Sequence, residues 1–143
     1  MLDRSTYRSL GALMGLAALA TTGLAAQTAA GTKNEPTTSG RPLSAWIADL
    51  KAPAPSSRNA AAYEIAGLGP AAAAAVPALI EALDDELPAV RFPVTVALGE
   101  IGPAAEAAIP RLKQVMDEDL NDEVAAGAKR AIRHIRPQAL SQE

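Results

Sequence analysis

The chain has 143 residues and a formal charge of −3, from 13 basic and 16 acidic side chains. This length predicts one modest domain with extensions and excludes a large multidomain enzyme. The absence of cysteine excludes disulfides, thiolate zinc sites and cysteine nucleophiles, and the negative charge argues against a nucleic-acid partner. Alanine supplies 34 residues and aromatic residues only 3%. Because alanine has the highest intrinsic helix propensity, this composition predicts an all-α protein of closely packed helices.

The first residues have the pattern of a secretory signal peptide. Arg4 and Arg8 precede the apolar run Leu10–Ala20, and small residues follow up to Ala26. The run is shorter than the roughly 20 residues that a transmembrane helix needs. We therefore expect residues 1–26 to be removed and the mature chain, without a stable membrane span, to be periplasmic or secreted. An uncleaved membrane anchor is the alternative, and the cleavage bond stays open.

Residues 27–41 are rich in Thr, Gly and Pro and show no apolar periodicity. This composition is typical of a flexible linker. We expect no secondary structure in this segment.

The remaining sequence repeats itself at a shift of 33 residues. The apolar residue that opens each copy is Leu43, Val76 or Ile109, and the turn Leu68-Gly69-Pro70 returns as Ile101-Gly102-Pro103. The third copy has one extra residue in its middle loop. The copies span about 43–75, 76–108 and 109–137, and residues 138–143 form a tail. So many matches in phase indicate a repeat architecture.

Each copy has the pattern of two helices. Apolar residues recur at spacings of three and four, as in Val94, Leu98 and Ile101. Prolines stand where a first helical turn tolerates them, and Gly69 and Gly102 stand where a helix ends. A pair of short helices cannot bury its apolar face alone, so neighbouring copies must stack. The sequence predicts an all-α fold, an α-solenoid of three helix pairs.

The segment Val76–Leu112 resembles a HEAT repeat, in the short bacterial form also found in phycobilisome lyase subunits. The resemblance covers residues 43–136 and implies a right-handed superhelix. Ankyrin and tetratricopeptide repeats fit less well because their signature residues are absent.

The resemblance also implies a ladder of side chains between successive repeats. In HEAT proteins a loop aspartate commonly binds the arginine that opens a second helix. The matching residues here are Arg58 with Asp84 and Arg91 with Asp117. Lys51 and Ala125 stand where the ladder would continue at either end. We interpret the rungs as structural, because such bonds fix the rotation between repeats.

We expect structural roles or effects for two further residues. Pro93 falls about five positions into a second helix, where it removes a hydrogen bond, so we expect a kink or a late helix start there. Trp46, near the first copy's start, offers a large apolar surface and is expected to cap the open end of the stack.

Candidates for chemistry are few. His134 has no evident nucleophile or orienting group in the sequence. The acidic run Asp117–Glu123 resembles the start of a calcium loop but lacks its glycine and its final glutamate, and calcium binding stays open. We assign no catalytic, cofactor-binding or metal-binding residue and expect no enzymatic activity.

These features favour an exported, non-enzymatic module or scaffold that binds a protein partner through its concave face. The candidate partner-binding residues on the second helices are Thr95, Lys129 and Arg133, with Arg58 and Ala62 on the same expected floor. The resemblance implies one alternative, an accessory subunit of a bilin-lyase-like enzyme that attaches a cofactor to a client. The sequence leaves the partner and the oligomeric state open.

Overall fold

The computed structural model describes residues 34–141. The predicted signal peptide and the first part of the predicted linker lie outside these described residues. The described elements are β1 (Thr37–Thr38), β2 (Arg41–Pro42), α2 (Leu43–Asp49), α3 (Pro55–Leu68), η1 (Gly69–Ala75), α4 (Val76–Ala82), α5 (Pro88–Ile101), η2 (Gly102–Ala108), α6 (Ile109–Glu118), α7 (Asp122–Ile135) and η3 (Pro137–Leu140).

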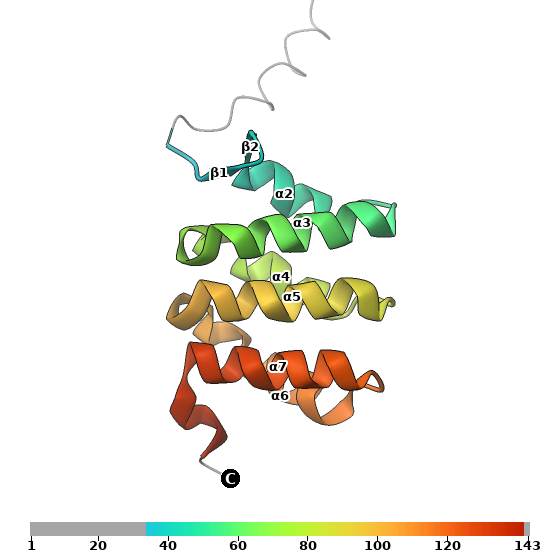
Figure 1. Ribbon diagram of the computed structural model, residues 1–143, viewed down its shortest axis with the longest axis vertical. Helices are drawn as coiled ribbons and strands as arrows, with labels where there is room; N and C mark the ends of the chain where they lie inside the picture. Colours follow the sequence, from blue (N-terminus) through green and yellow to red (C-terminus); the bar gives the residue numbers. More distant parts are fainter. Residues whose placement is uncertain (1–33, 142–143) are drawn as a thin grey trace, which may run out of the picture. The chain divides into compact units, whose positions relative to one another are not determined.

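The helices form two layers (Figure 1). The second helices of the three pairs, α3, α5 and α7, lie one beneath another, and each contacts the next. The first helices, α2, α4 and α6, form the layer behind them. This arrangement confirms the predicted all-α solenoid of helix pairs.

Proline and glycine set the helix boundaries. Pro55 and Pro88 open α3 and α5, where a missing backbone N–H costs nothing. Gly69 and Gly102 follow these helices with φ of 55° and 73°, a conformation that other residues adopt at a steric cost. The run Pro55–Ala82 is long and apolar enough to cross a membrane by length and composition alone. Gly69 divides that run into α3 and α4, both of which contribute to the solenoid core.

The core lies between the two layers and is built from equivalent positions of the three pairs. At one equivalent position, each second helix contributes a large aliphatic side chain that is fully buried. These residues are Ile65, Leu98 and Ile132. Alanines fill much of the remaining core, including Ala61 and Ala97, so neighbouring helices approach closely.

The end of the predicted linker contains two short strands, so the expectation of no secondary structure there is wrong. β1 and β2 pair antiparallel, with Thr38 opposite Arg41. Ser39 and Gly40 between them have positive φ values of 51° and 73°, as in the tight turns that suit a β-hairpin. The hydroxyls of Thr38 and Ser39 donate hydrogen bonds of 2.9 and 2.8 Å to Glu64 on α3.

Trp46 lies beneath this hairpin. Its indole Nε1 donates a 3.3 Å hydrogen bond to the carbonyl of Thr38, and the Arg41 guanidinium stacks 4.0 Å from its ring centroid. Trp46 is therefore only 8% exposed. The hairpin covers this end of the stack, and Trp46 is its anchor on α2.

The structure does not show the helix interruption expected at Pro93, because α5 begins at Pro88 and continues through it. Pro93 lacks the N–H that would bind the carbonyl of Ala89. The side chain of Asn59, on α3, donates to that carbonyl instead, at 2.5 Å. A hydrogen bond from the neighbouring repeat thus replaces the one that proline removes.

This compensation gives a testable coupling. We expect Asn59→Ala to lower the free energy of unfolding by about 1 kcal/mol, because the Ala89 carbonyl loses its donor. In a Pro93→Ala background the restored backbone N–H should bind that carbonyl, and the same substitution should then cost much less. Urea denaturation of the four proteins measures the coupling. Equal losses in both backgrounds would contradict the compensation.

Candidate functional site

Thr95 is fully buried, so its predicted role in binding a partner is wrong. Its hydroxyl donates a 2.7 Å hydrogen bond to the carbonyl of Phe92, and it faces Gly127 on α7. A methyl group at Gly127 would overlap the Thr95 hydroxyl. Ala62, at the equivalent position of α3, is also fully buried.

The reason is the direction that this position faces. In α5 it lies against Gly127 of the next second helix, and in α3, which also packs on the next second helix, it is fully buried. Lys129 holds the same position in α7, and Arg133 follows one turn later. Both are exposed. The predicted partner-binding residues are therefore split: Lys129 and Arg133 are accessible, and Thr95 belongs to the packing between repeats.

The close contact at Gly127 leads to a second prediction. Alanine normally stabilises a helix by up to about 1 kcal/mol relative to glycine. We expect Gly127→Ala to destabilise the protein instead, by about 1–3 kcal/mol, because the new methyl group overpacks against Thr95. In a Thr95→Ala background, which removes the overlapping hydroxyl, the loss should shrink or reverse. Thermal unfolding of both pairs tests this, and a stabilised single variant would contradict the contact.

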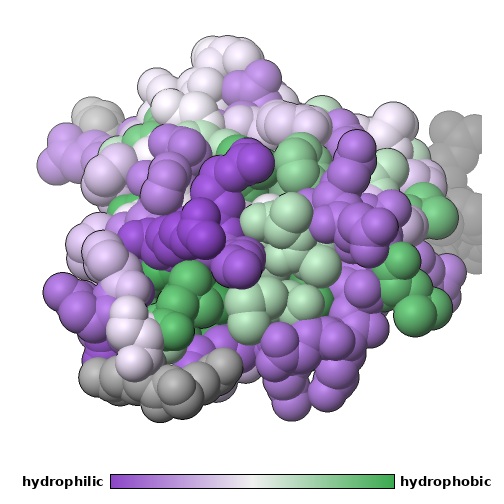
Figure 2. Space-filling model, turned by 60° about the horizontal axis from the view of Figure 1, so that its bottom comes forward, coloured by the Kyte–Doolittle hydropathy of each residue, from purple (hydrophilic) through white to green (hydrophobic). Residues whose placement is uncertain are grey.

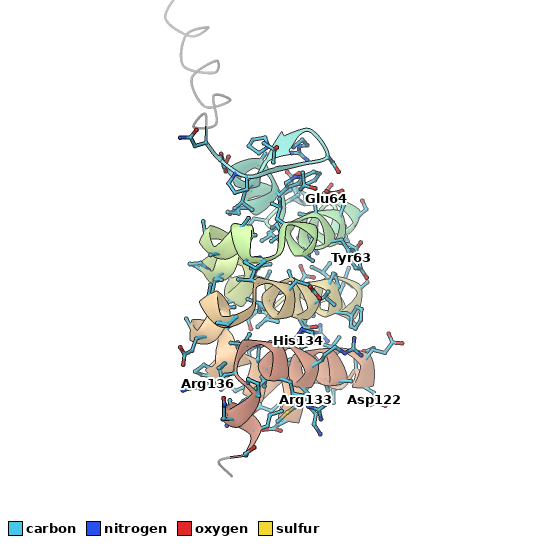
Figure 3. The ribbon with its side chains drawn as sticks, turned by 60° about the vertical axis from the view of Figure 1, so that its left-hand side comes forward. Tyr63, Glu64, Asp122, Arg133, His134 and Arg136 are labelled. Atoms are coloured by element: carbon cyan, nitrogen blue, oxygen red, sulfur yellow. The ribbon has the colours of Figure 1, made fainter. Side chains whose placement is uncertain are left out.

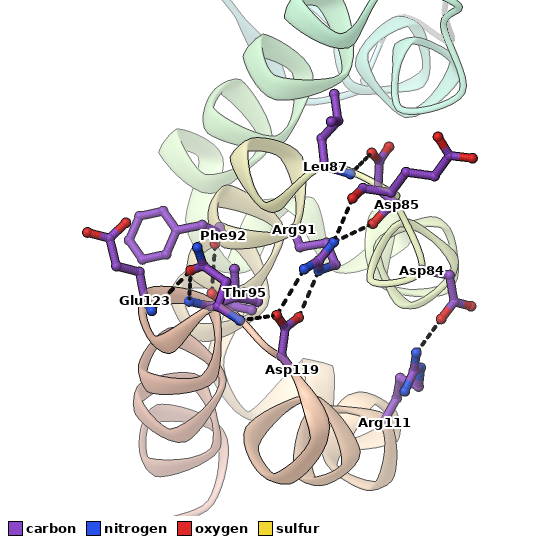
Figure 4. A network of polar contacts seen from close by, with 12 residues as sticks. Asp84, Asp85, Leu87, Arg91, Phe92, Thr95, Arg111, Asp119 and Glu123 are labelled. Atoms are coloured by element: carbon purple, nitrogen blue, oxygen red, sulfur yellow. Dashed lines mark hydrogen bonds and ion pairs between the residues drawn. The ribbon is translucent and has the colours of Figure 1, made fainter.

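The ladder between repeats is present, with different aspartates from those predicted. Arg58 donates to Asp85 at 2.6 and 3.2 Å, and Arg91 donates to Asp119 at 2.7 and 2.9 Å. Figure 4 shows the second of these rungs. Each rung is a bidentate arginine–aspartate pair and is mostly buried, since the Asp119 side chain is only 6% exposed.

The predicted partners Asp84 and Asp117 are wrong, because the acceptor is the aspartate that stands at a fixed place before the second helix. Asp84 is exposed and pairs with Arg111 on α6, and Asp117 is exposed in the last turn of α6. The acceptors Asp85 and Asp119 each stand two residues before a helix N-cap. There each also accepts a backbone N–H, from Leu87 or Asn121 respectively. The extra residue of the third copy lies before Asp119, in a longer first helix.

Each arginine also holds its own loop. Nη1 of Arg91 donates to the carbonyls of Asp85 and Glu86 at 2.8 and 3.1 Å. Nη1 of Arg58 does the same with the carbonyls of Ala52 and Pro53. One guanidinium thus closes the loop of its own repeat and binds the loop of the next.

The rungs hold their carboxyl groups in the charged form. The hydrogen bond from Arg91 lowers the pKa of Asp119 against the opposing effect of burial, and the N–H of Asn121 lowers it further. At Asp85, burial acts to raise the pKa, but hydrogen bonds from Arg58 and from the N–H of Leu87 outweigh it. Both carboxyl groups are therefore ionised at neutral pH.

A third prediction uses the pH dependence of this rung. At pH 7 we expect Asp119→Asn to lower the free energy of unfolding by about 2 kcal/mol, since Arg91 loses its charged partner. The pKa of Asp119 is lower in the folded state than its unfolded value of about 4. Its stabilisation is therefore present above pH 4 and lost as pH falls through the folded pKa. Denaturation between pH 7 and pH 2 should show a shallower acid loss in the variant. Asp117→Asn is the control, and an equal effect there would contradict the assignment.

The outer surface of α3, α5 and α7, here called the second-helix face, carries the exposed aromatic residues that the sequence analysis missed. Tyr63 on α3 is 49% exposed, and Phe92 and Val96 on α5 are partly exposed. Tyr63 and Phe92 line one surface groove together with Asn59, Ala89 and neighbouring loop residues. Tyr63 and Phe92 occupy outward positions on two successive second helices. This placement is the feature of the sequence from which the aromatic surface could have been predicted.

Charge on this face is concentrated at one end, apart from Glu123 on α7, which lines the groove with Tyr63 and Phe92. Glu100 lies near the end of α5, and Arg130 and His134 lie on the last two turns of α7. Figure 3 shows Tyr63 on α3 and His134 on α7, on either side of α5. Between them the face carries small and apolar side chains. Within residues 34–141, no group of three or more His, Asp or Glu side chains could hold a metal ion.

Comparison with known proteins identifies the family. The model of the HEAT repeats matches residues 43–133. This match covers more than half of the chain and spans all three helix pairs. Neither the curated proteins nor the solved structures contain a match to the chain. On the evidence of its helix pairs, its arginine ladder and the matched residues, the chain belongs to the HEAT-repeat family.

Proposed function

We propose that this protein is an exported, non-enzymatic interaction module that binds a protein partner through the second-helix face. The observation that carries this proposal is the placement of Tyr63, Phe92 and Val96 on one outer surface of α3 and α5. HEAT repeats are generally protein-interaction modules, which supports the same class of function.

The chemistry of the face suits a protein partner. Aromatic side chains combine a large apolar area with few rotatable bonds and are enriched at protein interfaces. Tyr63 also offers a hydroxyl that can bind a partner's backbone. Ala89, which lines the same groove, is exposed and small. A partner segment can therefore approach the helices closely and cover the aromatics.

The charged residues at one end of the face would orient the bound partner. Arg130 and His134 stand beyond the apolar centre, on α7, with Glu100 beside them on α5. Charges at the rim of an interface mainly set specificity and association rate. We infer a partner segment that places apolar residues over Tyr63 and Phe92 and polar residues over α7.

The N-terminal signal pattern supports the location. Arg4, Arg8 and the apolar run that follows are typical of secretion, so we place the module in the periplasm or outside the cell. There it would act as a scaffold component. The cofactor-attachment alternative has no observation in its favour among residues 34–141.

The test is site-specific photo-crosslinking in the native cell. A photoreactive amino acid replaces Tyr63, Phe92 or, as control, Pro103, which is exposed at the η2 turn. We expect one and the same protein adduct from positions 63 and 92 and none from 103. Mass spectrometry of the product should also find a mature N-terminus near Gln27.

Two results would contradict the proposal. Equal adducts from all three positions would mean that the second-helix face is not selective, and adducts from none would mean that it binds no protein. An intact Met1 would contradict export while leaving the binding result to be judged by itself.

A further inference from the structure

The last second helix carries a stripe of residues that face away from the rest of the stack. Residues three and four apart share one side of a helix. The terminal stripe of α7, defined by this spacing, consists of Asp122, Ala125, Ala126, Lys129 and Arg133. All of these are exposed except Ala125, which is half-buried.

The centre of the equivalent stripe is buried in the two earlier repeats, at Ala62 on α3 and at Thr95 and Gly99 on α5. On α5, Thr95 and Gly99 of the equivalent stripe pack against Gly127 and Ala131 of α7. Among residues 34–141 no further second helix follows α7, so the terminal stripe is not covered by another helix of the second-helix layer. Figure 2 brings this end of the molecule forward and shows hydrophilic side chains gathered around paler and hydrophobic ones. η3 contacts α7 and buries Ala139, yet it leaves the stripe exposed.

Two opposite charges of the stripe are placed symmetrically about its centre, and Arg133 lies beyond them. Asp122 and Lys129 are equally spaced from the midpoint between Ala125 and Ala126. A two-fold axis through that midpoint would place Asp122 of each copy opposite Lys129 of the other. Contacts around such an axis are self-complementary, since each pair occurs twice. Lys129 and Arg133 make no ion pair with any described residue.

The centre of the stripe suits a close helix contact. Ala125 and Ala126 present only methyl groups, which allow two helices to approach to the short end of the usual distance of about 8–10 Å. At that separation, an aspartate and a lysine on opposing helices can reach each other. The acidic first turn of α7 then faces the basic last turns of the other copy.

We propose that a second copy of this chain docks on the terminal stripe, with the two α7 helices antiparallel. The interface consists of the alanine pair at the axis and two Asp122–Lys129 ion pairs around it. Exposed ion pairs contribute little affinity and are screened by salt. The dimer is therefore weak and salt-sensitive, and the charges fix its register. This inference is independent of the second-helix face and leaves Tyr63 and Phe92 uncovered.

The test is sedimentation equilibrium of the mature protein at low and high salt. We expect dimerisation in 20 mM salt that weakens in 500 mM salt. Asp122→Lys and Lys129→Asp should each raise the dimer dissociation constant at least tenfold, because each places like charges opposite one another. The double variant Asp122→Lys/Lys129→Asp restores both ion pairs and should return within threefold of the original value.

Matched controls lie on the same helix. Glu123→Lys and Arg130→Asp reverse equivalent exposed charges outside the stripe and should leave dimerisation unchanged, and circular dichroism confirms that each variant is folded. A monomer at every concentration, or a double variant as weak as the singles, would overturn the proposal. The proposal would also fail if the protein stays monomeric but binds a polyglutamate peptide, and if Lys129→Asp abolishes that binding. That result would assign the stripe to an acidic partner.

Discussion

The arginine rungs are the directional contacts on which the stack depends. Apolar burial supplies most of the stability of such a solenoid, but it does not specify how one helix pair is rotated on the next. Arg91 does so because its guanidinium binds two carbonyls of its own loop and the carboxylate of Asp119 in the following loop. Both loops are fixed by a single planar group, whose five N–H donors have set directions. Helices α5 and α7 therefore meet in one register.

Because the helices meet in that register, their backbones can come into close contact. Gly99 lies against the backbone of Ala131, and Gly127 lies against Thr95. Contacts this close tolerate no extra methyl group, so a small rotation of one repeat would be costly. The hydrogen bond from Asn59 to the Ala89 carbonyl on α5 reinforces the same alignment. It also allows Pro93 to stand inside a helix. Rungs and small residues thus define a rigid layer, and the aromatic residues Tyr63 and Phe92 stand out from its outer surface.

The helix pairs and their stacking could be predicted because the information is local: apolar spacing, prolines and glycines repeat every 33 residues. The ladder partners could not, since only the loop geometry shows that the acceptor in the second copy is Asp85, next to Asp84, and that the inserted residue of the third copy moves its equivalent from position 118 to Asp119. Thr95 was misassigned because periodicity gives the stripe of a helix but not which neighbour covers it. The hairpin was missed because its order comes from Trp46 and Glu64, which lie outside the segment itself.

The first and last of the three described repeats carry different residues at positions where the middle repeat packs against its neighbours. Glu64 stands where Ala97 and Ala131 pack against a preceding helix, and hairpin hydroxyls cover it. At the other end, Lys129 and Arg133 replace the small residues that a following helix would need, and Ala125 replaces the rung arginine. A fourth parallel repeat would therefore bury unpaired charge at a cost of several kcal/mol. An antiparallel helix instead meets Lys129 with an aspartate, so the residues that disfavour a parallel repeat on α7 are also those that fit a second copy of α7.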